Sequence, residues 1–147
     1  MLPPSTPDRW TTRLWKMQFV SSPRHIALVR HQTGRALADW GYSRDDIDRA
    51  LLVCSELATN AVQHGHRAGH LFEVRITATK GDCLVEVSDP VSRPPRPFMA
   101  DTNDEHGRGL QLVAALAKET GHRPRSPWGK TVWARLALTE PRTTGNT

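Results

Sequence analysis

Three polar side chains recur every four residues in an otherwise apolar stretch of the sequence, LLVCSELATNAVQHG. They are Glu56, Asn60 and His64. In an α-helix, a step of four residues advances roughly 40° around the axis, so the three side chains share one face. A broad apolar arc adjoins this face and places the trio at the edge of a core. A solvated helix face is the alternative, and the neighbouring motifs decide between the two.

Two further features could complete a site beside this helix. The strand pattern of residues 83–89 puts Asp89 on the same side as the buried positions, and an inward carboxylate needs a partner. A long Pro-rich stretch, 90–109, then ends on Gly107 and Gly109 at a predicted helix start, where free backbone N–H groups attract phosphate. Together these features predict a nucleotide pocket. A carboxylate and an amide would form one wall, a second carboxylate would form the floor, and the helix start that attracts phosphate would lie opposite.

The rest of the sequence predicts the elements that position these residues. Apolar residues at helical spacing predict three helices, at 23–40, 43–64 and 110–119. Alternating apolar and polar residues predict four strands, at 14–20, 71–79, 83–89 and 129–139. Strands interleaved with helices predict a two-layer α/β sandwich, with a mixed sheet and the three helices on one face. We expect one domain over residues 13–139, a flexible N-terminal arm over 1–12 and a flexible tail over 140–147.

Composition narrows the possible partners and location. The 20 Lys and Arg residues against 15 Asp and Glu give a net charge of +5, which permits a nucleic-acid partner. The basic residues are scattered along the chain, however, which favours a solvated basic surface. The two cysteines, Cys54 and Cys83, lie in apolar segments, which predicts reduced buried thiols and a cytoplasmic location. No apolar stretch reaches about 18 residues, so neither a membrane span nor secretion is expected.

Four motifs in this order resemble the nucleotide-binding boxes of the GHKL superfamily, which contains gyrase, heat-shock chaperones, histidine kinases and mismatch-repair proteins. The four motifs are SELATNAVQHG (55–65), Asp89, GRGLQLVAALA (107–117) and GKTVWARL (129–136). Within the superfamily, they are most similar to the small stand-alone anti-sigma factor serine kinases. The similarity extends over about residues 14–139. It implies a Bergerat-type ATP-binding fold.

The resemblance implies a role for each residue at a matching position. Glu56 would be the general base that accepts a proton from a serine hydroxyl, and Asn60 would ligate Mg²⁺ beside the triphosphate of ATP. Asp89 would accept a hydrogen bond from the adenine amino group, with Thr131 near the base. The remaining residues of the implied ATP site lie near the phosphates or in the lid, which is the end of the Pro-rich stretch 90–109 with the helix start that follows it. They are His64, Gly107, Arg108, Gly109 and Leu110.

The resemblance also implies a function and a set of partners. The chain would be an ATP-binding anti-sigma factor with serine/threonine protein kinase activity. It would phosphorylate an anti-anti-sigma protein of the STAS type and would bind a sigma factor. The resemblance allows a homodimer, whereas no direct nucleic-acid partner and no membrane partner are expected.

One box departs from the family pattern. The Asp-x-Gly-x-Gly box reads Asp89-Pro90-Val91-Ser92-Arg93, so bulkier residues stand where two glycines normally make room in the pocket wall. This departure motivates a second hypothesis, a nucleotide-dependent protein-interaction module with little or no kinase activity. A third hypothesis, a basic nucleic-acid-binding domain, would require steeply salt-dependent DNA binding.

Overall fold

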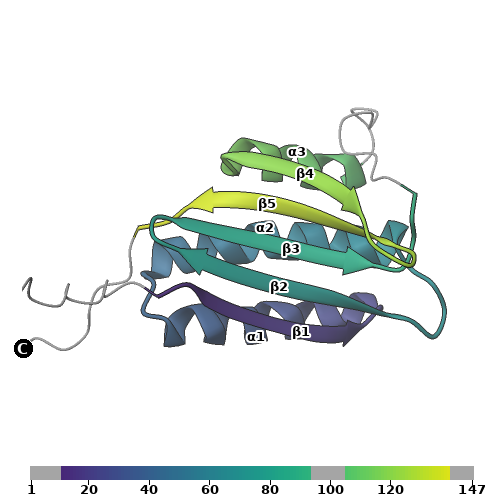
Figure 1. The fold of residues 1–147 in the computed structure, drawn as a ribbon, viewed down its shortest axis with the longest axis horizontal. Coiled ribbons are helices and arrows are strands. Elements are labelled where there is room, and N and C mark those ends of the chain that lie inside the picture. The colour runs from purple at the N-terminus through teal and green to yellow at the C-terminus, as the bar shows by residue number, and fades with distance from the viewer. Residues whose placement is uncertain (1–10, 94–104, 140–147) are drawn as a thin grey trace, which may run out of the picture.

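The structure, a computed structural model, describes residues 11–93 and 105–139. Helices cover one face of a single sheet and leave the other face open (Figure 1). This arrangement confirms the predicted two-layer α/β sandwich. The predicted C-terminal tail and nearly all of the predicted N-terminal arm lie outside the described residues.

Five strands form the sheet, in the order β1-β2-β3-β5-β4. Their bounds are β1 Arg13–Val20, β2 Leu71–Thr79, β3 Asp82–Asp89, β4 Glu119–Pro124 and β5 Lys130–Ala137. The prediction of a mixed sheet is wrong, because all four pairs of neighbouring strands run antiparallel. The cause is β4, which the sequence did not reveal. Because β4 adds a strand between α3 and β5 in the sequence, the chain direction is reversed once more before β5. Strand β5 therefore runs antiparallel to β3.

The described residues form three α-helices, and Figure 1 shows the helices behind the sheet. Their bounds are α1 Ile26–Asp39, α2 Arg44–His64 and α3 Glu105–Leu116, and a short 3-10 turn, Pro23–His25, leads into α1. The backbone N–H of Asp46 donates to Ser43 Oγ at 3.2 Å, so Ser43 caps α2 as predicted. Helix α3 begins at Glu105 rather than at residue 110. Within the described residues, no helix is long and apolar enough to cross a membrane.

The core lies between α2 and the centre of the sheet. Its fully buried side chains include Val53 of α2, Ile76 of β2 and Val85 of β3. Both cysteines are free and buried in this core, as predicted, and burial raises the pKa of each thiol to about 12. The thiols are therefore protonated and unreactive at neutral pH.

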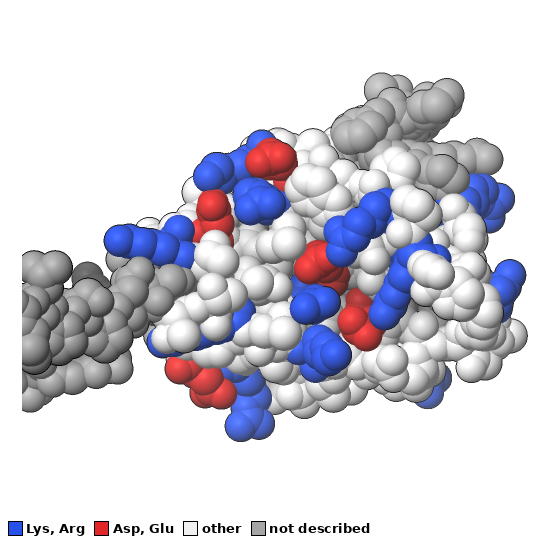
Figure 2. All heavy atoms as spheres, viewed as in Figure 1, with Lys and Arg blue, Asp and Glu red and all other residues white. Residues whose placement is uncertain are grey.

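The open face of the sheet carries charges of both signs. Figure 2 shows Lys and Arg interspersed with Asp and Glu across this face. Three ion pairs join the two signs: Arg123–Glu86, Arg125–Glu73 and Lys118–Asp82. Acidic residues among the basic ones do not favour binding to a phosphate backbone, so this face gives no support to the nucleic-acid hypothesis.

Candidate functional site

Helix α2 presents the polar trio that the sequence predicted. Glu56 and Asn60 lie one helical turn apart, and His64 is the last residue of the helix. Asn60 is buried, Glu56 is partly buried and His64 is exposed. Among the described residues, the side chains of Glu56 and Asn60 have no hydrogen-bond partner. A carboxylate and an amide at the edge of a core, neither of them hydrogen-bonded within the described part of the chain, are available to a ligand.

Helix α3 approaches α2 closely at Glu56. A Cβ built on Gly109 would collide with Glu56 Oε2, so the carboxylate occupies the space that a side chain at position 109 would need. The two lid glycines were expected to let the backbone approach phosphate from outside the helix. The structure instead places Gly107 in the first turn of α3 and Gly109 just behind it.

Only part of the lid motif is available to a ligand in the described structure. The backbone N–H of Gly107 is among the first four of α3, which have no partner within the helix. Leu110 is a core residue with 7% of its surface exposed, so its role is packing rather than contact with a ligand. Arg108 belongs to the first turn of α3, and its side chain lies outside the described part of the structure.

Replacing Gly109 by alanine should impair the phosphoryl transfer that the resemblance implies more than it impairs stability. The colliding atom of Glu56 is the far end of a flexible side chain, and alanine is a better helix former than glycine. We therefore expect a midpoint of thermal unfolding within about 4 °C of the wild type. Because the carboxylate must move, we expect phosphoryl transfer to slow by about tenfold to a hundredfold. Calorimetry and a transfer assay on the same sample would measure both, and wild-type activity in this variant would contradict the positioning role.

Asp89 is buried and faces inward, as the strand pattern predicted. It ends β3 on the face that carries the core, and only 4% of its surface is exposed. A Cβ built on Gly65 would collide with its carboxylate, so Asp89 points toward the C-terminal end of α2. Burial raises the pKa of Asp89, while the Val91 N–H and the Lys130 ammonium lower it again.

The partner of Asp89 is Lys130, which the sequence reasoning missed. Lys130 Nζ lies 3.1 Å from both carboxylate oxygens and donates to the Val91 carbonyl at 3.0 Å. The strand register pairs Lys130 with Asp89 across β5 and β3. The signal was present in the sequence, because Lys130 alternates with the inward Val132 and Ala134 and because an inward Asp89 needs a partner.

Thr131 does not lie beside Asp89. Its Oγ1 is 2.7 Å from Ser88 Oγ, and both residues belong to the opposite face of the sheet. Successive residues of a strand point to opposite faces, so Lys130 and Thr131 cannot share one. This geometry therefore gives no support to the base contact implied for Thr131, and Lys130 is the residue of β5 that lies beside Asp89.

The segment without the family glycines is tied to the start of β5. Val91 N donates to Asp89 Oδ1 at 2.8 Å, and Gly129 N donates to Ser92 Oγ at 2.9 Å. Gly129 has a φ of +100°, and a Cβ at this residue would collide with the Asp89 carbonyl oxygen. These bonds fix the backbone after Asp89, where the family pattern has flexible glycines.

The fit of the site to Mg²⁺ follows from its oxygen atoms. The described residues contain no group of three or more His, Cys, Asp or Glu that could hold a metal ion. Mg²⁺ does not require such a group, because it commonly takes one or two protein oxygens and shares its other positions with water and phosphate. The Asn60 amide oxygen, buried and without a partner among the described residues, fits this requirement.

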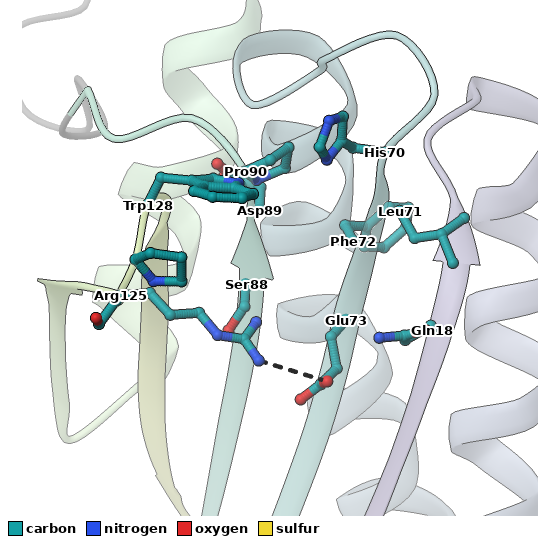
Figure 3. A pocket seen from close by; sticks show the side chains of 12 residues that line it. Gln18, His70, Leu71, Phe72, Glu73, Ser88, Asp89, Pro90, Arg125 and Trp128 are labelled. Carbon is teal, nitrogen blue, oxygen red and sulfur yellow. Dashed lines mark ion pairs between the residues drawn. The ribbon is translucent and has the colours of Figure 1, made fainter.

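A separate pocket of about 270 Å³ opens on the other side of Asp89 (Figure 3). Trp128 and Pro90 stand at one end of it, and an ion pair of 3.7 Å joins Arg125 and Glu73 within it. Its lining includes Asp89 but neither Glu56 nor Asn60. The pocket therefore does not contain the predicted catalytic face of α2.

Comparison with known proteins gives one family. The model of the histidine kinase-like ATPase domain matches residues 19–136. A serine-protein kinase RsbW of Bacillus licheniformis is 33% identical over an alignment 119 residues long, and the alignment covers 71% of this chain and 74% of the relative. A second RsbW sequence of that species is 29% identical over 120 residues, with the same coverage.

A solved structure supports the fold alone. The crystal structure of the RsbU and RsbW domains of a Mycobacterium tuberculosis protein matches with a TM-score of 0.65 and 22% identity. The match covers 88% of this chain and 33% of that chain, so this chain spans about a third of the length of that protein.

Proposed function

Because the chain belongs to the family of histidine kinase-like ATPase domains, we propose that it is an ATP-dependent protein serine kinase that acts as an anti-sigma factor. Its relatives named serine-protein kinase RsbW support this activity. The observation that carries the proposal is the face of α2, where Glu56 and Asn60 lie one turn apart beside Gly109. Neither side chain has a hydrogen-bond partner among the described residues.

ATP would lie between α2, the start of α3 and the end of β3. The buried carboxylate of Asp89 would accept a hydrogen bond from the adenine amino group. The N–H groups in the first turn of α3, that of Gly107 among them, have no partner within the helix and would face the phosphates. His64 and Arg108 would add positive charge or hydrogen bonds near the phosphates.

The chemical step needs a base and a way to hold the triphosphate. Glu56 would accept the proton of the substrate serine hydroxyl as the γ-phosphoryl group transfers to that oxygen. Asn60 would hold Mg²⁺ through its amide oxygen. When bound, Mg²⁺ would neutralise charge that develops on the phosphate oxygens. The close approach of α3 at Gly109 would keep the Glu56 carboxylate in place.

The proposed substrate is a serine of an anti-anti-sigma protein of the STAS type, and the second proposed partner is a sigma factor. Purified chain, radiolabelled ATP and Mg²⁺ should transfer label to the cognate anti-anti-sigma protein. A partner in which the acceptor serine is replaced by alanine should remain unlabelled. Absence of label on the wild-type partner, at Mg²⁺ concentrations that support ATP binding, would contradict the kinase proposal.

A second candidate is a nucleotide-dependent interaction module with little catalysis. The observation that favours it is the backbone after Asp89, where Val91 and Arg93 replace the family glycines. Hydrogen bonds from Gly129 N to Ser92 Oγ and from Lys130 Nζ to the Val91 carbonyl tie this segment to β5. This candidate predicts binding of ATP and of the partner without transfer of label. The labelling experiment therefore distinguishes the two.

A further inference from the structure

We infer that Lys130 recognises the nucleotide base together with Asp89, by donating a hydrogen bond to ring nitrogen N1 of adenine. The inference rests on the proposed function, because it takes ATP as the ligand. It assigns to the protein a second contact with the base, made by a charged group.

The Lys130 ammonium has one N–H donor that no described residue uses. It carries three N–H donors. Its hydrogen bonds to Asp89 Oδ1, at 3.1 Å, and to the Val91 carbonyl, at 3.0 Å, use two of them. No further hydrogen bond from Lys130 reaches any of the described residues. Because 3% of this side chain is exposed, an unused donor lacks the water that would compensate it at a surface.

The Asp89 carboxylate also keeps an acceptor position. Its two oxygens offer about four lone-pair sites. Oδ1 accepts from both Val91 N and Lys130 Nζ. Oδ2 lies 3.1 Å from Lys130 Nζ and packs against Gly65, but it accepts no hydrogen bond from the described residues. A spare acceptor and a spare donor therefore lie side by side on the same carboxylate–ammonium pair.

Adenine presents the complementary pair of groups. On its Watson–Crick edge, the exocyclic amino group is a donor and the adjacent N1 is an acceptor. Asp89 would accept from the amino group while Lys130 donates to N1. The register of β3 and β5 fixes this pairing, because it sets Lys130 directly opposite Asp89.

The test compares ATP with 1-deaza-ATP, in which C–H replaces ring nitrogen N1. In a calorimetric titration of the wild-type chain, 1-deaza-ATP should bind at least about tenfold more weakly than ATP, because a hydrogen bond from a charged donor is lost. In Lys130→Met, both nucleotides should bind weakly and with nearly equal affinity. Lys118→Met, which removes an exposed lysine paired with Asp82, should keep the wild-type ratio.

Each outcome decides between the inference and the proposed function. Equal affinity of the wild type for the two nucleotides would overturn the role of Lys130 and leave the ATP site intact. A ratio that persists in Lys130→Met would also overturn it. No binding of ATP to the wild type would overturn the proposed function and this inference together. If Lys130→Met does not fold, Asp89→Asn with Lys130→Met removes both charges and carries the same comparison.

Discussion

Glu56→Gln should lower the rate of phosphoryl transfer by about 10²- to 10⁴-fold, the range typical for loss of a general base. Glutamine keeps the size of the side chain and can still fit beside Gly109, but it cannot accept a proton from the substrate serine. Binding of ATP should change little, because Glu56 lies apart from the proposed contacts with the base. Transfer of label and calorimetric titration on the same protein would separate the two effects.

The matched control for this substitution is Glu119→Gln. Glu119 begins the edge strand β4, and its side chain is 62% exposed. We expect wild-type transfer from this variant, since its ion pair with Arg135 lies at the surface. Undiminished transfer from Glu56→Gln would show that another group takes the proton.

Lys130→Met should destabilise the folded chain by about 3 to 5 kcal/mol, the usual cost of removing one partner of a buried ion pair. The substitution leaves the Asp89 carboxylate buried without its counter-charge, and it removes the hydrogen bond to the Val91 carbonyl. Urea unfolding followed by circular dichroism would measure the difference. The variant should also lose stability with rising pH, because an unpaired buried carboxylate favours its neutral form.

Two controls show whether the cost comes from the unpaired charge. The double variant Asp89→Asn, Lys130→Met should recover a large part of the loss, because no buried charge remains. Lys118→Met should cost less than about 1 kcal/mol, since its ion pair with Asp82 is exposed. A double variant as unstable as Lys130→Met would mean that packing, and not charge, sets the cost.

Most of the fold could be predicted because its elements carry strong periodic patterns. Strand β2, Leu71–Thr79, has the predicted bounds, and α2, Arg44–His64, begins after the predicted cap. Both elements place a regular row of apolar residues against one core. Where a regular row of apolar residues packs against one core, the periodicity of the sequence correctly predicts which face of the element is buried.

The missed strand had no such pattern. Strand β4, Glu119–Pro124, lies at the sheet edge, has no fully buried residue and contains Gly121. Its formation depends on pairing with β5, which is a tertiary contact. Helix α3 was placed too late in the chain for a related reason, because glycines at 107 and 109 indicate a loop when only local propensity is considered.

The two acids and the amide of the proposed site could be predicted from the sequence, whereas Lys130 was missed. Alternation along β3 correctly placed Asp89 inward. The same alternation along β5 places Lys130 inward, yet the resemblance directed attention to Thr131. The closeness of Gly109 to Glu56 joins two segments far apart in the sequence, so only the structure could reveal it.

Calorimetric titration of the purified chain with ATP, with and without Mg²⁺, is the most direct test of the nucleotide site. We expect saturable binding that is stronger with Mg²⁺. In Asn60→Ala, the gain from Mg²⁺ should be lost while binding of ATP alone persists. Absence of ATP binding to the wild type under either condition would contradict the assignment of this site.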